Sequence, residues 1–344
     1  MTKIKIGIIG LGKAWERLHS PAFNRLNDKF EIAAVCDSDL SKAIAAAQSL
    51  GLPGESAYNS FTRMLEYADI EAVDTMVPIY ENYECAKAVI ESGKHLIAEK
   101  PFASTAKAAK ELIKLKDKYE VKVMVAENYR YDNENILIKN LISEDKIGDV
   151  IYFIDNYVTD FEQEMLGDTF AATEWRQHPE FKGGIFLDSA IHHIARHRFL
   201  FGKVNSLYAF GYPSDVDFSP YSCINALLTY DDNIAGHYSF YAVGKETQAP
   251  FVGFRIFGTN GEIYLEDKQC GYVNVSYNHG YHDAIPYAPN EGYYHELSNF
   301  YEAVRSNAEI VSTPEKELGD IEVISSILES AEKQKLVKYK TAQE

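Results

Sequence analysis

The chain up to Asp37 is the segment that most constrains the fold. An almost wholly apolar run at residues 4–9 leads into Gly10-Leu11-Gly12-Lys13-Ala14. A helix-like segment then extends to about residue 26, and a second apolar run at residues 31–36 ends at Asp37. Apolar runs without alternation are typical of strands that are covered on both faces. The order strand, glycine turn, helix, strand and acid predicts a dinucleotide-binding unit.

Gly10 and Gly12 would let the backbone approach a pyrophosphate at the start of the helix. A carboxylate at Asp37 can accept hydrogen bonds from both ribose hydroxyls and would repel a 2′-phosphate. Lys13 argues in the other direction, because its ammonium group could bind such a phosphate. We therefore expect NAD or NADP as the cofactor, with NAD slightly favoured.

Two alternatives stay open for this segment. A Gly-x-Gly turn is also compatible with an ordinary tight connection between strand and helix, and Trp15 stands where the fingerprint has its third small residue. Asp37 could instead cap the following helix, a role that Ser38 or Asp39 could equally fill.

Strand-like and helix-like segments continue to alternate up to residue 126. Strands separated by helices of this length predict a doubly wound parallel sheet, and hence an α/β fold. The expected helices cover residues 41–50, 60–66, 82–91 and 105–119, and the further strands cover residues 72–77, 96–98 and 121–126.

Lys100 lies just after the apolar run at residues 96–98 and directly before Pro101. A residue before proline is disfavoured in the helical region, so Lys100 cannot simply begin the next helix. Ligands of open parallel sheets bind beyond the carboxyl ends of the strands, which is the edge expected for Gly10 and Asp37. This placement favours a site lysine over a solvated lysine in a turn.

From residue 127 onward the pattern changes, because strands follow one another with the helices set apart. This order predicts an α+β domain with a mostly antiparallel sheet. We therefore divide the chain into a dinucleotide-binding domain, residues 1–126, and a substrate-binding domain, residues 127–344. The expected strands are 150–158, 206–212, 221–230, 234–243, 252–257, 262–265 and 272–277, and the expected helices are 133–143, 185–201, 293–305 and 315–334.

The densest group of reactive side chains lies in residues 175–193. Asp188 and His192 are four residues apart and would share one face of a helix. A carboxylate beside an imidazole orients it and raises its basicity, which prepares a general base. Gly183-Gly184 would let the chain approach a ligand closely, and Arg176 could bind an oxygen-rich substrate. A surface ion pair is the alternative for Asp188 and His192.

The other basic side chains of this segment have simpler interpretations. His193 and His197 are also four residues apart, but no third ligand accompanies them, so we expect no metal site. Arg196 and Arg198 are interpreted as a solvated or interface-facing pair.

Charge and cysteine usage bear on the partners. The formal net charge of −17 argues against nucleic acid or an anionic membrane as the main partner.

The four cysteines have no CxxC spacing, which favours a reduced, cytoplasmic chain without disulfides. No signal peptide is expected, because Lys3 and Lys5 interrupt the first apolar run. The sequence contains no run of about 18 apolar residues, so we expect no transmembrane helix.

Several motifs occur together in this chain: Gly10-x-Gly12 with His19 and Pro21, Glu99-Lys100-Pro101, Trp175-Arg176 with Gly183-Gly184-x-x-x-Asp188-x-x-x-His192, and Gly258-Thr259-x-Gly261. In this combination the sequence resembles, over nearly its whole length, the Gfo/Idh/MocA family of NAD(P)-dependent oxidoreductases. The resemblance implies a Rossmann domain followed by a second domain with a large open sheet that is commonly used to form homodimers or homotetramers. The sequence departs from the family pattern at three positions. Trp15 lies at the pyrophosphate turn, Tyr83 stands where many members carry His, and Ala195 stands where many members carry Asp.

The resemblance also implies a cofactor over residues 10–14 with its nicotinamide near Lys100, and a Lys100–Pro101 bond that is often cis. In family terms, Lys100, Asp188 and His192 are the catalytic set, and Glu99 flanks them on the cofactor side. The predicted cofactor contacts are Gly10, Gly12, Lys13, Ala14, Asp37, Pro78, Asn82, Glu99 and Lys100, and the predicted substrate contacts are Asn128, Arg130, Tyr157, Arg176 and His193.

The hypothesis that follows is hydride transfer between nicotinamide and a carbinol carbon of a small-molecule sugar, polyol or related cyclic alcohol. His192 would take the hydroxyl proton during oxidation, with Asp188 holding the imidazolium. Lys100 would hydrogen-bond to the same oxygen. Two alternatives remain: a non-enzymatic dinucleotide-binding regulator, and an NAD-dependent elimination or glycoside cleavage through transient oxidation.

Overall fold

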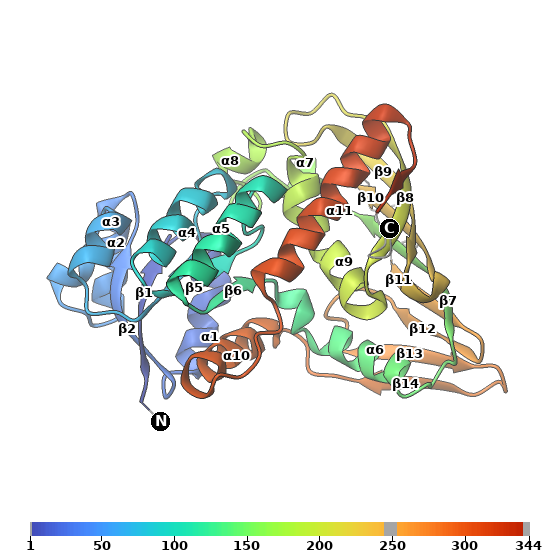
Figure 1. Ribbon diagram of the computed structural model, residues 1–344, viewed down its shortest axis with the longest axis horizontal. Coiled ribbons are helices and arrows are strands. Elements are labelled where there is room, and N and C mark those ends of the chain that lie inside the picture. Colours follow the sequence, from blue (N-terminus) through green and yellow to red (C-terminus); the bar gives the residue numbers. More distant parts are fainter. Residues whose placement is uncertain (1, 244–252, 340–344) are drawn as a thin grey trace. The chain divides into compact units, whose positions relative to one another are not determined.

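A computed structural model describes residues 2–243 and 253–339 of the chain (Figure 1). They pack into two compact units: the first holds residues 2–131 and 292–319, and the second holds residues 132–243, 253–291 and 320–339. Residues 292–319 therefore return to the first unit late in the sequence. The functional division at residue 126 stays a prediction. The predicted strand 252–257 includes Val252, which lies outside the described residues.

The first unit is built on a parallel sheet of six strands in the order β3-β2-β1-β4-β5-β6. Figure 1 labels β1, β2, β5 and β6 of this sheet. The chain order reverses between β1 and β4, which makes the sheet doubly wound. The predicted parallel sheet is thereby confirmed. Its strands are β1 (Ile4–Ile9), β2 (Phe30–Cys36), β3 (Ala57–Tyr58), β4 (Ala72–Thr75), β5 (His95–Glu99) and β6 (Val123–Ala126).

Helices cover both faces of this sheet, which explains the unbroken apolar strands. Ile6 and Ile8 of β1 belong to one buried cluster with Leu297 and Phe300 of helix α10. On the other face, a side chain at Gly7 would come within 2.9 Å of Met64 in α3. The helical segments of the unit are η1 (Trp15–His19), α1 (Ser20–Arg25), α2 (Leu40–Ser49), η2 (Gly54–Ser56), α3 (Phe61–Tyr67), η3 (Ile79–Glu81), α4 (Asn82–Glu91), α5 (Ala106–Tyr119), η4 (Asn128–Arg130) and α10 (Gly292–Ser306).

The second unit contains a nine-stranded sheet in the order β14-β13-β12-β11-β7-β10-β9-β8-β15. Its pairs are antiparallel except for β7 and β10, which run parallel. The predicted large, mostly antiparallel sheet is therefore confirmed. The strands are β7 (Val150–Val158), β8 (Val204–Pro213), β9 (Tyr221–Tyr230), β10 (Ala235–Tyr241), β11 (Gly253–Gly258), β12 (Gly261–Leu265), β13 (Tyr272–Tyr277), β14 (His282–Pro286) and β15 (Val337–Lys338).

Helices pack on one face of the large sheet. Phe153 of β7 stacks on Phe201 of α9 with ring centroids 4.6 Å apart, and the Ala209 amide of β8 donates to Ser330 Oγ of α11 at 2.9 Å. The other face of the same strands exposes apolar side chains, including Phe210 and Leu227, which are 58% and 61% exposed. The helical segments here are α6 (Asn133–Ser143), α7 (Phe161–Glu164), α8 (Glu174–Gln177), α9 (Ile185–Phe201), η5 (Asp231–Asn233) and α11 (Pro314–Lys333), which begins in the first unit.

None of the helices within residues 2–243 and 253–339 combines the length and the apolar character needed to cross a bilayer.

Candidate functional site

The glycine turn after β1 has the geometry that a phosphate-binding loop needs. Gly10 has φ +90°, and a Cβ there would lie 2.3 Å from the Met76 carbonyl oxygen, so only glycine fits. At Gly12, in contrast, a Cβ would meet no atom within 4 Å. The main chain at Gly12 is thus open to a ligand at the start of the following helical segment, which fits a pyrophosphate. Lys13 and Ala14, which follow, are half-buried.

Asp37 is tied to this turn and does not cap a helix. Its Oδ2 accepts the Leu11 amide at 2.9 Å, and its Oδ1 accepts the Asp39 amide at 3.0 Å. The cap of α2 is Asp39, whose side chain accepts the Ser41 amide at 2.9 Å. Asp39, and not Asp37, therefore caps this helix. The half-buried Asp37 carboxylate lies beside the glycine turn.

The segment that follows the turn winds as a π-helix over Trp15–His19 and continues directly into helix α1, whose second residue is Pro21. This wider winding directs Trp15 and His19 inward, and both are buried. Trp15 packs against Phe23, with ring centroids 6.1 Å apart. The residue that departs from the dinucleotide fingerprint is therefore a core residue, and π-helical turns often occur at functional sites.

Lys100 follows β5, so it lies at the same carboxyl edge of the parallel sheet as Gly10 and Asp37. The Lys100–Pro101 bond is cis, as the resemblance implied, and Lys100 itself is half-buried. Asn82 Nδ2, at the start of α4, donates to the Pro101 carbonyl at 2.7 Å, and Pro78 precedes η3 at the same edge. The predicted cofactor contacts of the first unit thus follow the carboxyl ends of β1, β2, β4 and β5.

A buried histidine lies behind this edge. His19 Nδ1 is 2.8 Å from Asp74 Oδ2, and its Nε2 is 3.0 Å from Glu99 Oε1. Burial opposes a charge on the ring, but the two carboxylates raise the pKa of His19 well above its ordinary value. Sequence reasoning noted His19 only as part of the resemblance. Its partners are distant in sequence. The only hint of a buried polar contact was Asp74, an acidic residue inside an otherwise apolar strand.

Asn128 and Arg130 form the short helical turn after β6 and are both buried. They pack within the first unit, although they were predicted as substrate contacts of the second domain.

In the second unit, Asp188 and His192 lie one turn apart near the start of α9. The turn before the helix requires glycine, because Gly184 has φ +50° and a Cβ there would lie 2.2 Å from the Phe218 carbonyl oxygen. Asp188 is buried and accepts Nε of Arg176 at 2.7 Å. The Arg176 guanidinium stacks 4.2 Å from the Trp175 ring. Arg176, predicted as a substrate contact, is therefore also a partner of the predicted catalytic carboxylate.

His193 and Tyr157 are neighbours in an aromatic cluster between α9 and the sheet. Their ring centroids are 4.5 Å apart, and His193 Nδ1 is 2.7 Å from the Tyr238 hydroxyl. Burial lowers the pKa of His193 well below its ordinary value, which favours the neutral ring. Both residues were predicted as substrate contacts, and in this unit they also hold α9 to the sheet.

Arg196 and Arg198, which were interpreted as a solvated or interface-facing pair, instead make ion pairs inside the second unit. Arg196 is buried, and its Nη2 lies 2.6 Å from Asp155 Oδ2, which also binds His197 Nε2 at 2.6 Å. Arg198 pairs with the buried Asp320. The four-residue spacing of His193 and His197 thus reflects two separate contacts with the sheet. No cluster of three or more metal-binding side chains occurs in the described ranges 2–243 and 253–339.

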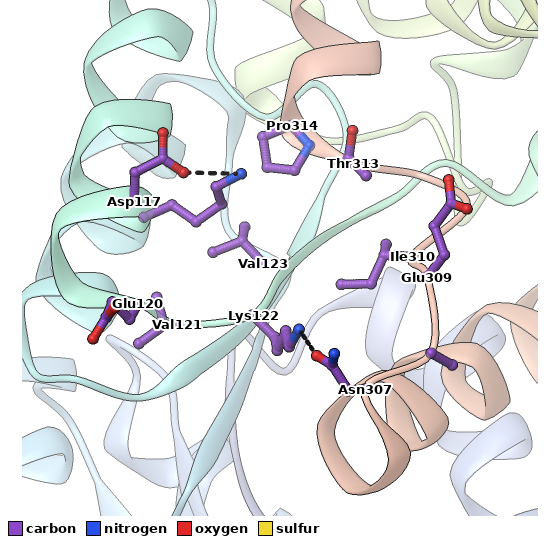
Figure 2. A pocket seen from close by; sticks show the side chains of 12 residues that line it. Asp117, Glu120, Val121, Lys122, Val123, Asn307, Glu309, Ile310, Thr313 and Pro314 are labelled. Atoms are coloured by element: carbon purple, nitrogen blue, oxygen red, sulfur yellow. Dashed lines mark hydrogen bonds and ion pairs between the residues drawn. The ribbon is translucent and has the colours of Figure 1, made fainter.

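A pocket of about 490 Å³ lies at the opposite, amino end of β6, between the end of α5 and the connection from α10 to α11. Figure 2 shows Lys122 pointing toward Asn307 across this pocket. Lys116, also in its wall, pairs with Asp117 and Glu315. None of the predicted site residues lines this pocket.

Comparison with known proteins identifies the family. Residues 4–127 match the oxidoreductase family described by its NAD-binding Rossmann fold, and residues 139–339 match the C-terminal alpha/beta domain of the same family. The chain belongs to the Gfo/Idh/MocA oxidoreductases. As a member of that family it is an NAD(P)-dependent oxidoreductase.

Individual relatives of this Gfo/Idh/MocA protein differ in how much they share. An uncharacterized protein of Saccharomyces cerevisiae is 25% identical over 97% of both chains. Levoglucosan dehydrogenase of Pseudarthrobacter phenanthrenivorans is 31% identical over 61% of this chain and 54% of that enzyme, so the match spans about half of its length. An oxidoreductase structure from Thermotoga maritima has a TM-score of 0.85 and 26% identity, with 98% of each chain covered.

Proposed function

We propose that this protein transfers a hydride between a nicotinamide cofactor and a carbinol carbon of a sugar, polyol or related cyclic alcohol. The observation that carries the proposal is the shared carboxyl edge of Gly10, Asp37 and Lys100 in the first unit. Ligands of doubly wound sheets bind at this edge, near the point where the strand order reverses. The name of the levoglucosan dehydrogenase relative is in keeping with a carbohydrate substrate.

The proposed cofactor contacts follow from the chemistry of each position. The glycine turn at Gly10 and Gly12 and the following Ala14 would hold the pyrophosphate through main-chain groups, with Asp37 or Lys13 at the ribose. Pro78, Asn82 and Glu99 would border the nicotinamide end beside Lys100. A bound nicotinamide supplies or accepts the hydride, and the protein positions the reactants.

The proposed acid–base roles rest on the residue types and their local surroundings. His192 takes the proton of the substrate hydroxyl during oxidation and returns it during reduction. Asp188, held by Arg176, is the carboxylate that stabilises the imidazolium. Lys100 donates a hydrogen bond to the reacting oxygen and stabilises its developing negative charge. Asn128, Arg130, Tyr157, Arg176 and His193 remain proposed substrate contacts.

A single substitution tests this assignment. Lys100→Met should retain NAD(P) binding, measured by cofactor fluorescence, and lower kcat about a hundredfold to a thousandfold on a panel of polyols and aldoses. The matched control is Lys94→Met at the start of the same strand, where the ammonium binds the Ile70 carbonyl at 2.9 Å. Lys94→Met should keep full turnover. Unchanged turnover in Lys100→Met would refute the role of this lysine.

We further propose a cytoplasmic homodimer or homotetramer assembled through the open face of the large sheet. Phe210, Tyr212 and Leu227 are 58%, 71% and 61% exposed on neighbouring strands of that face, and exposed apolar clusters of this kind mark interaction surfaces. Sedimentation analysis of the wild type and of Leu227→Glu tests the proposal. A monomeric wild type would refute it.

A further inference from the structure

The most unusual polar group of the first unit is a fully buried histidine between two carboxylates. His19 is 0% exposed. Its Nδ1 lies 2.8 Å from Asp74 Oδ2 in β4, and its Nε2 lies 3.0 Å from Glu99 Oε1 in β5. A neutral imidazole has one N–H and can donate to only one of them, whereas the imidazolium can donate to both. The geometry therefore fits an imidazolium that donates to both carboxyl groups.

Three acidic side chains surround the ring, and they come from β4, β5 and α10. Besides Asp74 and Glu99, Glu296 of α10 is 0% exposed, and Tyr293 of the same helix packs against the ring with centroids 5.2 Å apart. Neither carboxyl oxygen of Glu296 has a hydrogen-bond partner among the described residues. Burial raises the pKa of Glu296 well above its ordinary value; His19 opposes this rise, and Glu99, Asp74 and Glu127 add to it.

Removing a partner from such a group leaves an uncompensated buried charge, which is costly. An imidazolium at His19 would be the counter-charge for the carboxylates of Asp74 and Glu99. Burial raises the pKa of Asp74, and the charge and hydrogen bond of His19 oppose that rise. Glu99 is consequently fixed by two bonds: Oε1 is held by His19, and Oε2 accepts the main-chain amide of Lys100 at 3.0 Å.

We propose that His19 is a positioning residue: through Glu99 it fixes the main chain at Lys100 and so sets the direction in which the lysine side chain leaves β5. The proposal rests on the proposed role of Lys100 in the reaction. His19 touches neither substrate nor cofactor in this account. The influence of His19 on Lys100 passes through the carboxylate of Glu99. One oxygen of that carboxylate binds the His19 ring, and the other accepts the Lys100 amide.

The first experiment uses the cofactor-free protein and a readout that does not depend on activity. Amide hydrogen exchange, followed by NMR, reports the Lys100 N–H directly. In His19→Gln this amide should exchange about tenfold faster than in the wild type, while the amides of Leu96 and Ala98 within β5 change little. The matched control is His95→Gln at the other end of β5, where the imidazole accepts the Lys122 amide at 3.0 Å. This control should leave Lys100 exchange unchanged.

The second experiment separates positioning from binding. With a substrate from the polyol and aldose panel, His19→Gln should lower kcat about tenfold to a hundredfold, because small misplacements of a reacting group are expensive in rate. The Kd for the cofactor should stay within about threefold, since the glycine turn and Asp37 are retained. A loss confined to cofactor Kd would overturn the proposal.

A measurement on the unmutated protein covers the case in which His19→Gln fails to fold. Nitrogen-15 NMR of the His19 ring at neutral pH should show both nitrogens protonated. One unprotonated ring nitrogen would overturn the proposal, as would an unchanged Lys100 exchange rate in a folded His19→Gln. If Lys100→Met instead keeps full turnover, the proposed function fails, and the exchange and ring measurements still decide whether His19 fixes this corner.

Discussion

Arg176 Nε donates to Asp188 Oδ2 at 2.7 Å, so a guanidinium from the segment before α9 holds the carboxylate that was predicted to orient His192. Arg176 is itself fixed, because it stacks on Trp175 and donates from Nη1 to the Phe170 carbonyl at 3.3 Å. The conformation of the segment before α9, which includes the short helix α8, is therefore linked to the position of a predicted catalytic group. In this arrangement Arg176 supports Asp188 as well as being a proposed substrate contact.

Arg176→Met should lower kcat about tenfold, because a hydrogen bond to a buried charged group is lost. The change is measured by steady-state kinetics with the substrate that the panel identifies. Arg255→Met is the matched control: Arg255 also stacks on an aromatic ring, Tyr264, at 4.3 Å, and it lies on the sheet away from α9. Equal losses in both variants would contradict a specific link between Arg176 and Asp188.

Asp37→Ser should shift the ratio of NADP to NAD affinity about tenfold or more toward NADP, because a like charge beside the 2′-phosphate is removed. Absolute affinity for both cofactors should also fall, since Asp37 holds the Leu11 amide of the glycine turn. Asp39→Ala is the control: it removes the cap of α2 and should cost about 1 kcal/mol of stability without moving the ratio. Titration of both cofactors by fluorescence measures the ratio, and an unchanged value in Asp37→Ser would place the ribose elsewhere.

His193 predicts a pH dependence of stability. Burial depresses its pKa in the folded protein, so below about pH 6.5 the unfolded chain binds a proton that the folded chain does not. The contribution of His193 to the free energy of unfolding is therefore constant above about pH 6.5. It decreases as the pH falls below that value, by at most about 1.4 kcal/mol per pH unit. His193→Gln should flatten the slope of unfolding free energy between pH 6.5 and 5 by this amount.

Tyr238→Phe is the control for that slope. It removes the hydroxyl that lies 2.7 Å from His193 Nδ1 but keeps the titrating imidazole. Urea unfolding at several pH values should show the wild-type slope in Tyr238→Phe and the reduced slope in His193→Gln. An identical slope in all three proteins would show that His193 is protonated in the folded state.

Most of the parallel sheet could be predicted from the sequence, because five of its six strands are short, largely apolar runs separated by helix-like segments. The two-residue strand β3 was not predicted. The same logic placed Lys100 at the edge that holds Gly10 and Asp37, since parallel strands all end on one side. The return of residues 292–319 to the first unit could not be predicted. No local pattern indicates which sheet the buried face of α10 will cover.

The polar clusters were missed for a related reason. His19, Asp74 and Glu99 are separated by 55 and 80 residues along the chain and meet only because the sheet order brings β4 and β5 together behind the π-helical segment. Helical periodicity related Asp188 to His192, but it carries no information on an irregular segment such as the one that delivers Arg176. Arg196 was interpreted as solvated or interface-facing, because no sequence pattern singled out its partner, Asp155 in β7.

Deuterium tracing tests the central claim, hydride transfer to or from a carbinol carbon, most directly. The protein is incubated with NAD⁺ or NADP⁺ and with polyols and aldoses that carry deuterium on the reacting carbon. Mass spectrometry of the nicotinamide follows the label. The account predicts one deuterium at C4 of each reduced nicotinamide and one oxidised substrate per cofactor consumed. Product formation with no net cofactor reduction, or with the deuterium released to water, would contradict it.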